Sequence, residues 1–452
     1  MITAVGLALS SCGGGGGDAP PAPLPSGPVT ITGTASFESV PNNNTNGALN
    51  YAAATFKPIR GATVQLIDAA GATLASGTTS DTGAYSLGPM TVTGPIRVRV
   101  RAELKRTAAT GGSWDVVVRD NTSGNALYAL DSPAFTPAGT LETRNVQAGS
   151  GWGGTGYTGV RAAGPFAVLD TVWRSMQKVL GVSPNANFAP LSIYWSVNNR
   201  PASGGGGIAA GNIGTSFFTG FGGNRALYLL GAENVDTDEY DTHVVAHEWG
   251  HYFESAFSRS DSVGGPHSGG DRLDMRVAFS EGWGNAWSGM ALGSPRYADS
   301  GQALQGTGFV IDVSVRPANN RGWYSEDSVQ YLLWSWHEGA SLGFAPIFSA
   351  LTGPLRTSSV LVAIHHFAAE LKAAAPAGAT AVNTLLADQL IDSADALGSN
   401  ETNDGGVPLA LPVYNTWAGS ATLYCVSTAA GTPNKLGLFK AVRFTTVAAG
   451  SR

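Results

Sequence analysis

The chain has 452 residues, a formal net charge of −6 at pH 7 and an apolar fraction of 43 %, which is enough for two or three folded domains and excludes a disordered chain. Charged residues make up only 13 % and form no basic cluster, which argues against a nucleic-acid partner. The two cysteines exclude a disulfide scaffold and any zinc site built from cysteine pairs. No apolar run reaches about 18 residues, so the sequence predicts no membrane-spanning helix.

The segment 1–27 contains Leu9-Ser10-Ser11-Cys12 after a short apolar start and before a tract rich in glycine and proline. This arrangement resembles a bacterial lipoprotein signal, in which Cys12 would carry the lipid and become the mature N-terminus. Residues 1–8 lack the Lys or Arg of such a signal. The resemblance implies a location at the bacterial cell envelope, lipid-anchored or secreted (the outer membrane, if the host has one), with the lipid on Cys12 as the membrane contact. The alternative is a glycine-rich terminus with an incidental cysteine.

The next region, residues 28–150, is predicted to be rich in β-strands. Ile96, Val98 and Val100 alternate with arginines, the period-2 pattern of a strand with one solvated face. The stretch 58–89 resembles the carboxypeptidase regulatory-like domain, a small transthyretin-like β-sandwich. The resemblance implies an all-β sandwich that serves as a spacer or binding module and carries no chemistry.

Helical periodicity begins near residue 160 and then dominates the chain. The spacing of apolar residues predicts a helix over 166–180, a strand over 191–197 and two further apolar runs, followed by helices over 237–257, 274–292, 325–338, 357–374 and 379–391. Strands followed by helices predict an α+β domain over residues 151–410. Residues 434–450 resemble the opening of a bacterial pre-peptidase C-terminal β-domain, so 411–452 is interpreted as the start of a truncated β-domain.

The segment His247-Glu248-Trp249-Gly250-His251 is the strongest chemical signal in the sequence. Residues four apart share one face of a helix, so both imidazoles can reach a single ion. Glu248 projects beside that face, where a carboxylate can hold a water molecule without being a ligand. The alternative is a surface helix with hydrogen-bonded histidines.

A group of acidic residues precedes this motif. Asp236 and Glu239 have the spacing of a capping box that would start the helix. Calcium binding by the acidic group is the alternative for these side chains: Asp236, Asp238, Glu239 and Asp241.

A catalytic zinc takes three protein ligands and leaves a position for water. Glu254 and Phe257 stand where a metzincin has Gly and His, which excludes that class. The later segment 279–285, Phe-Ser-Glu-Gly-Trp-Gly-Asn, resembles the gluzincin metallopeptidases, the thermolysin and fungalysin group. This resemblance implies a zincin-like catalytic domain that binds one Zn²⁺ through His247, His251 and Glu281.

The resemblance also implies how the remaining groups act. It gives Glu248 the role of general base and acid, and Asn285 stands where those families often carry an Asp that steadies a ligand histidine. The segment 320–325 resembles the place where thermolysin-like enzymes carry a histidine donor to the oxyanion, and Tyr324 falls at that position. His267 and His337 are the other candidates for the donor.

These features predict a zinc metalloendopeptidase that acts on a peptide or protein substrate at the cell envelope, as a monomer. The alternatives are a surface-anchored binding protein with an inactive peptidase-like domain, and a zinc aminopeptidase. The segment 231–234, Gly-Ala-Glu-Asn, echoes the amine-binding motif of aminopeptidase gluzincins but lacks its methionine, and we interpret it as coincidence.

Overall fold

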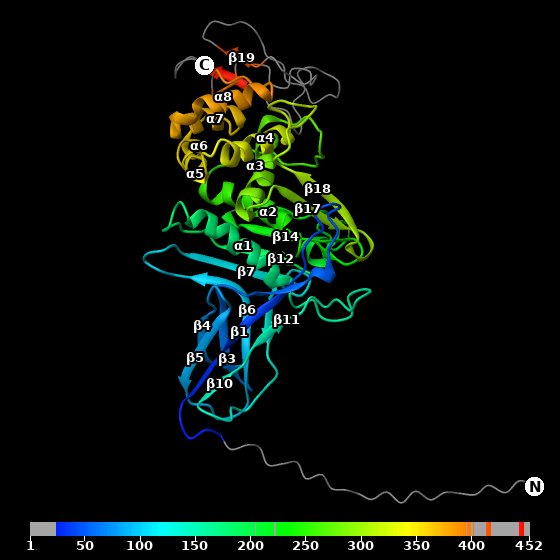
Figure 1. Cartoon of the computed structure of the whole chain (residues 1–452), viewed down its shortest axis with the longest axis vertical. Helices are drawn as coiled ribbons and strands as arrows, with labels where there is room; N and C mark the ends of the chain where they lie inside the picture. Colours follow the sequence, from blue (N-terminus) through cyan, green and yellow to red (C-terminus); the bar gives the residue numbers. More distant parts are fainter. Residues whose placement is uncertain are drawn as a thin grey trace, which may run out of the picture.

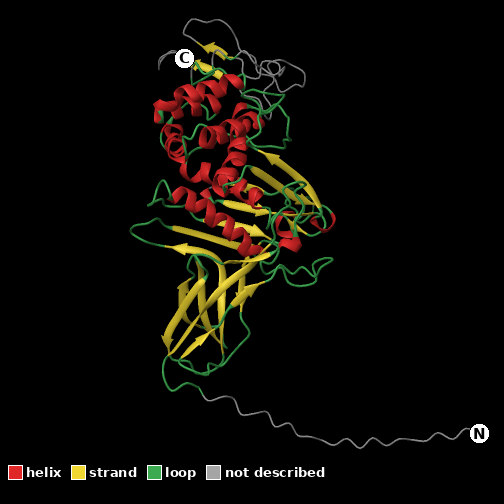
Figure 2. Cartoon of the chain, viewed as in Figure 1, coloured by secondary structure: helices red, strands yellow, loops and turns green. Residues whose placement is uncertain are grey.

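The computed structural model describes residues 24–203, 205–220, 223–394, 396–398 and 401, together with the backbone of the short strands β19 (Val413–Thr416) and β20 (Arg443–Thr446). The described part is a mixed α/β structure with β-strands toward the N-terminal end and helices stacked toward the other (Figures 1 and 2). None of its helices is long and apolar enough to cross a membrane. Cys12 and the predicted lipoprotein signal lie outside the described residues, as do the side chains of the predicted C-terminal β-domain.

The N-terminal half is built from eleven strands in two sheets. In the first sheet, the long strand β1 pairs with four others: β1 (Val29–Ser39), β2 (Thr55–Pro58), β5 (Ala84–Met90), β10 (Leu141–Thr143) and β11 (Val146–Ala148). The second sheet takes the other six: β3 (Ala62–Asp68), β4 (Thr73–Thr78), β6 (Ile96–Arg106), β7 (Trp114–Asp120), β8 (Ala126–Leu127) and β9 (Ala129–Asp131). Apolar residues of both sheets pack in one core, to which β6 contributes the predicted Ile96, Val98 and Val100.

The second sheet continues beyond residue 150. β7 pairs in parallel with β12 (Leu191–Trp195), and the order then runs through β14 (Ala226–Leu229) to β13 (Phe217–Thr219) at the edge. Helix α1 (Gly164–Leu180) packs on this sheet through Phe166, Leu169 and Met176 at the predicted helical spacing. One sheet therefore runs across the position where the sequence predicts a domain boundary.

The helices that follow carry the candidate site, with α3 packed between α2 and α4. Their bounds are α2 (Thr242–Phe257), α3 (Met275–Leu292), α4 (Glu326–Trp334), α5 (Phe344–Thr352), α6 (Pro354–Thr357), α7 (Ile364–Ala374) and α8 (Ala379–Asp388). A π-helical turn, Ser335–Gly339, follows α4. Beside them lies a small antiparallel sheet of β15 (Gly231–Ala232), β16 (Asp236–Thr237), β17 (Arg296–Gly301) and β18 (Thr307–Asp312).

The predicted capping box is wrong. Helix α2 begins at Thr242, and Asp236 lies in strand β16 before it. Glu239 forms a buried ion pair with Arg161. Asp241, at the N-cap, accepts hydrogen bonds from the backbone and hydroxyl of Ser300 on β17. Buried carboxylates require fixed hydrogen-bonding or charged partners. Here Arg161 and Ser300 supply them, in place of the backbone N–H groups at the start of the helix.

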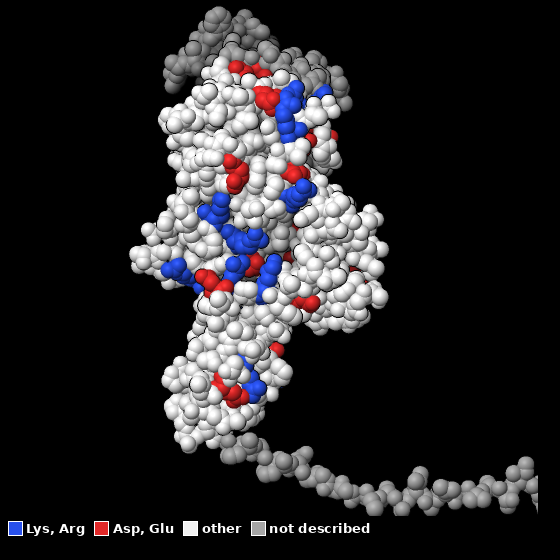
Figure 3. Space-filling model, in the orientation of Figure 1, with Lys and Arg blue, Asp and Glu red and all other residues white. Residues whose placement is uncertain are grey.

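Charged side chains are sparse on the face shown in Figure 3, where basic and acidic groups are mixed. This distribution follows from a composition with only 13 % charged residues. Much of the surface is therefore uncharged, and the buried charges are concentrated around α2 and its neighbours.

Candidate metal centre

The three predicted metal ligands come together between α2 and α3. The Nε2 atoms of His247 and His251 lie 3.0 Å apart, and Oε2 of Glu281 lies 3.3 Å from the first and 3.4 Å from the second. Bonds of about 2.0–2.1 Å in a zinc tetrahedron place neighbouring ligand atoms about 3.3–3.4 Å apart. The three atoms thus form a triangle of the size that one face of such a tetrahedron requires.

Two glycines on α3 make this close approach possible. A Cβ atom at Gly284 would lie 2.7 Å from Cε1 of His247, and one at Gly282 would lie 2.5 Å from Cβ of Val329 on α4. Both distances are far below normal van der Waals contact. The glycine spacing of α3 therefore lets the helix contact the α2 histidine on one side and α4 on the other.

The ring orientation of His247 is fixed by Asn285. Its Nδ1 lies 2.8 Å from Oδ1 of Asn285, while Nδ2 of Asn285 donates to Oε1 of Glu326 at 2.6 Å and to Oε1 of Gln330 at 2.8 Å. Because both amide hydrogens are used by acceptors, the amide oxygen must face the imidazole. Nδ1 of His247 is then the donor to Asn285, and Nε2 is the ring nitrogen that faces the other two members of the ligand triangle.

His251 is held by a second carboxylate that the sequence analysis did not identify. Its Nδ1 lies 3.3 Å from Oε2 of Glu254 and 3.2 Å from Oγ of Ser280, and the serine donates to the same carboxylate oxygen at 2.6 Å. Glu254 is almost fully buried. The three-residue spacing between His251 and Glu254 on one helix was the available signal, since such residues are neighbours on its surface.

Glu281 and the two histidines shift one another's pKa values. Burial acts to raise the pKa of Glu281, but the charge on His251 and hydrogen bonds from both imidazoles outweigh it and hold the pKa well below its ordinary range. Burial likewise acts to lower the pKa of His247, but the hydrogen bond to Glu281 raises it. The ionised carboxylate and the two imidazoles are thus a donor set suited to a divalent cation.

Glu248 lies beside the triangle and is not part of it. It is 8 % exposed, and its negative charge acts on both His247 and His251. Among the described residues none donates a hydrogen bond to its carboxylate. The group is therefore next to the ligands and available to a water molecule or a substrate.

His267 is the additional histidine that the structure brings to this centre. It lies in the loop between α2 and α3, with Nε2 3.5 Å from Oε2 of Glu281 and 3.6 Å from Oε2 of Glu326. Burial raises the pKa of Glu326. Glu326 and Gln330 also contact the centre and had no signal in the sequence beyond their position in α4.

The two other candidate donors are placed differently. Tyr324 is 3 % exposed and its hydroxyl donates to the carbonyl oxygen of Arg321 at 2.8 Å. His337 is buried in the π-helical turn, 2.9 Å from the carboxylate of Glu338. These partners, the Arg321 carbonyl and the Glu338 carboxylate, are not members of the ligand triangle.

A second group of carboxylates lies at the start of α2. Ligand atoms of Asp236, Asp238 and Asp299 lie within 4.8 Å of one another. Burial raises the pKa of Asp236 to about 6 and that of Asp299 to about 7. Of the four acidic residues that the sequence offers for calcium, Asp236 and Asp238 belong to this group, and Glu239 is paired with Arg161.

No protein-family model matches the chain, and no curated protein matches it. Among solved structures, the precursor of protealysin, a metalloproteinase from Serratia proteamaculans, is similar over 50 % of this chain and 76 % of its own, with 9 % identity and a TM-score of 0.30. A 9R-lipoxygenase from Cyanothece PCC8801 is similar over 37 % of this chain, with 10 % identity and a TM-score of 0.17, and the chain spans 26 % of its length. At these TM-scores neither similarity defines the fold or the function of this chain.

Proposed function

We propose that the chain is a zinc-dependent endopeptidase, with His247, His251 and Glu281 as the zinc ligands. The observation that supports this most is the triangle of their ligand atoms, with sides of 3.0, 3.3 and 3.4 Å. Two imidazoles and one carboxylate are the donor set of a catalytic zinc site, which keeps a further position open. Each imidazole also has a second hydrogen-bonded partner, as zinc-bound histidines do.

Glu248 is the proton carrier in this proposal. Zinc, when bound, supplies Lewis acidity toward the scissile carbonyl and lowers the pKa of water. The carboxylate of Glu248 accepts the proton from the attacking water and passes it to the leaving amine. Its lack of other hydrogen-bond donors in the described residues leaves it available for both transfers.

The transition state also requires a donor to the developing oxyanion. The resemblance of the segment 320–325 assigned this role to Tyr324, whose hydroxyl is committed to the carbonyl of Arg321. We propose His267 instead, because its Nε2 lies 3.5 Å from the ligand oxygen of Glu281.

The other functions remain as alternatives. A surface-anchored binding protein with an inactive site would not need the complete set of ligands and general base. An aminopeptidase needs a group that binds the substrate amine, and Glu233 is exposed at the turn between β15 and β16. A lipid on Cys12, which would hold the enzyme at the bacterial cell envelope, stays a prediction that detergent-phase partitioning of Cys12→Ser would test.

Metal content tests this proposal directly. We expect about one zinc per chain in the purified protein and loss of zinc from Glu281→Ala, because two imidazoles alone hold the ion weakly. Chelator treatment should abolish cleavage of casein by the wild type, and added zinc should restore it. Wild-type metal content in Glu281→Ala would place the third ligand elsewhere.

A further inference from the structure

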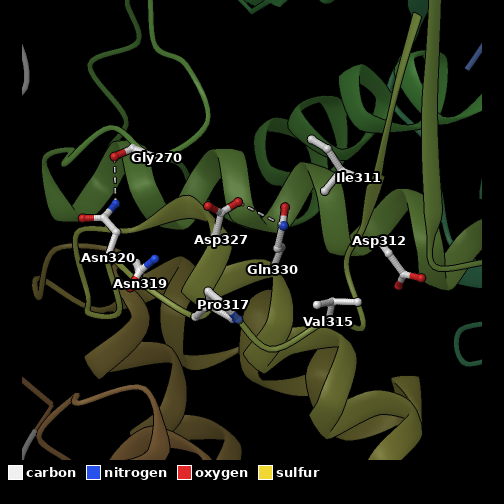
Figure 4. A pocket seen from close by; sticks show the side chains of 10 residues that line it. Gly270, Ile311, Asp312, Val315, Pro317, Asn319, Asn320, Asp327 and Gln330 are labelled. Atoms are coloured by element: carbon white, nitrogen blue, oxygen red, sulfur yellow. Dashed lines mark hydrogen bonds between the residues drawn. The ribbon is translucent and has the colours of Figure 1, made fainter. Parts of the chain in front are cut away.

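A pocket of about 460 Å³ lies between strand β18 and the first turns of α4. Figure 4 shows Asp327 and Gln330 pointing toward one another on one side, and Asp312 on the other. Gly270, from the loop that also carries His267, completes the wall beside Asn320. The loop and the helix that contribute to the metal centre therefore also form this pocket.

Two short series of contacts connect the pocket with His247. On the α4 side, Gln330 lines the pocket and accepts a hydrogen bond from Asn285, the residue bonded to His247. On the β18 side, Ile311 lines the pocket and is the cross-strand partner of Tyr297, whose ring lies 6.1 Å from that of His247. In each series one residue, Asn285 or Tyr297, therefore separates the pocket lining from His247, which places the pocket beside the metal centre.

The polar groups of the pocket favour a cation. Its lining contains the carboxylates of Asp312 and Asp327 and several amides, and no Lys, Arg or His. Asp327 has no cationic partner in the described part of the chain, and one of its oxygens accepts from Gln330 at 3.3 Å. Burial raises the pKa of Asp327, so this carboxylate is partly removed from water, where attraction to a cation is stronger.

Asp312, unlike Asp327, already has a basic side chain close to its carboxylate. Arg296 lies 3.7 Å from its Oδ2, and this arginine is half exposed, so the pair contributes little. Apolar groups of Ile311, Val315 and Pro317 also line the pocket. A long basic side chain can lay its aliphatic stem along such surfaces and keep its charged end at the carboxylates.

We infer that this pocket is a substrate subsite for a lysine or arginine side chain and that Asp327 determines the specificity. The inference rests on the proposed endopeptidase function and adds to it the substrate class. Norleucine has the four-carbon stem of lysine and lacks the terminal ammonium group, so it serves as the uncharged comparison. A charged hydrogen bond contributes about 1.5–3 kcal/mol, so discrimination between the two should be about tenfold or more.

The test uses quenched-fluorescence peptides in which one residue near the cleaved bond is lysine, arginine or norleucine. We expect wild-type kcat/KM to be at least about tenfold higher for the basic peptides. Asp327→Asn, which keeps the acceptor for Gln330, should reduce this preference to within about twofold while cleavage of the norleucine peptide stays unchanged. The matched control is Asp115→Asn on β7, an exposed aspartate outside the pocket, which should keep the preference.

A binding measurement separates this inference from the proposed function. Fluorescence anisotropy of labelled, uncleaved peptides should give tighter binding of the lysine peptide than of the norleucine peptide to Glu248→Gln, and Asp327→Asn in that background should remove the difference. If the wild type cleaves both peptides equally and Asp327→Asn changes neither kcat/KM nor binding, the subsite is wrong and the endopeptidase proposal stands. If no peptide is cleaved but the lysine peptide binds in a manner that depends on Asp327, the endopeptidase proposal is wrong and the subsite stands.

Discussion

The two histidines of α2 present Nε2 to the same point because each Nδ1 is already engaged. Asn285 holds the Nδ1 of His247, and Glu254 with Ser280 holds that of His251. Fixed rings lose little freedom when a metal binds, which favours tight binding. The third histidine of the centre, His267, has its Nε2 near the carboxylates of Glu281 and Glu326, and its Nδ1 lies 3.2 Å from the carbonyl oxygen of Gly265.

The role of His267 leads to a prediction about turnover. A donor to the oxyanion acts once the tetrahedral species forms, so its removal affects kcat more than KM. His267→Ala should lower kcat by roughly ten- to a thousandfold with zinc content unchanged. Tyr324→Phe, which keeps the ring and removes the hydroxyl that donates to the Arg321 carbonyl, should keep kcat within about twofold. Steady-state kinetics on one quenched peptide would contradict this assignment by showing the large loss in Tyr324→Phe and none in His267→Ala.

At the scale of elements, the centre depends on the distance between α2 and α3. Gly284 faces the His247 ring and Gly250 of α2 faces Gly284, where a Cβ would lie 3.2 Å from the Gly284 Cα. Around this contact pack large aromatic side chains of both helices: Trp249, Phe253, Trp283 and Trp287. The helix pair is therefore close at the ligands because glycines line the contact there.

This packing predicts the effect of one added methyl group. In Gly284→Ala the new Cβ would lie 2.7 Å from the imidazole of His247, so the ring or the helix must move. We expect zinc affinity to fall about tenfold or more and the free energy of unfolding to fall by about 1–3 kcal/mol. Gly94→Ala, with no neighbouring atom within 4 Å, is the control for competitive zinc titration and thermal unfolding. Wild-type zinc affinity in Gly284→Ala would contradict the close-approach argument.

The sequence predicted the positions of these helices more accurately than it predicted the contacts around them. The predicted ranges place α3 and the end of α2 correctly, and Gly293 after α3 is a local stop signal. The start of α2 was wrong because Asp236 pairs with Gly301 in the small sheet and Glu239 forms an ion pair with Arg161. The sequence analysis did not predict the β17–β18 hairpin. Its Tyr297 is buried against His243 of α2, a long-range contact that the local sequence does not indicate.

The same distinction applies to the site. His247 and His251 follow from a four-residue spacing, which helix geometry converts into a shared face. Glu281 required a resemblance, because no local rule relates residues on different helices. The position of His267 depends on the path of the loop between α2 and α3, and that of Glu326 on how α4 packs against α3. Neither position is encoded by spacing along the chain.

At the scale of the whole molecule, the N-terminal strands are part of the support for the centre. β12 takes β7 as its parallel partner, with Leu191 opposite Val116, and α1 packs on β6 and β7 of the same sheet. The side chain of Asn42, from the segment after β1, donates to Asp241 at the start of α2. Removing the N-terminal region would therefore expose a sheet edge and apolar surface.

This continuity predicts the behaviour of a fragment. A chain beginning at residue 151 should be largely unfolded or aggregated, because β12 would lose its partner and α1 much of its buried surface. The comparison is far-UV circular dichroism, thermal unfolding and zinc stoichiometry of the fragment against the full chain. A soluble fragment that unfolds cooperatively and binds one zinc would show that the catalytic region folds independently of the β-region.

Turnover of Glu248→Gln at matched zinc content measures whether Glu248 assists hydrolysis beside the three-ligand metal centre. The glutamine keeps the size of the side chain but does not accept a proton, so zinc should remain at about one per chain while kcat on a peptide falls about a thousandfold. A Glu248→Gln protein that is fully loaded with zinc and turns over at the wild-type rate would exclude Glu248 as the proton carrier.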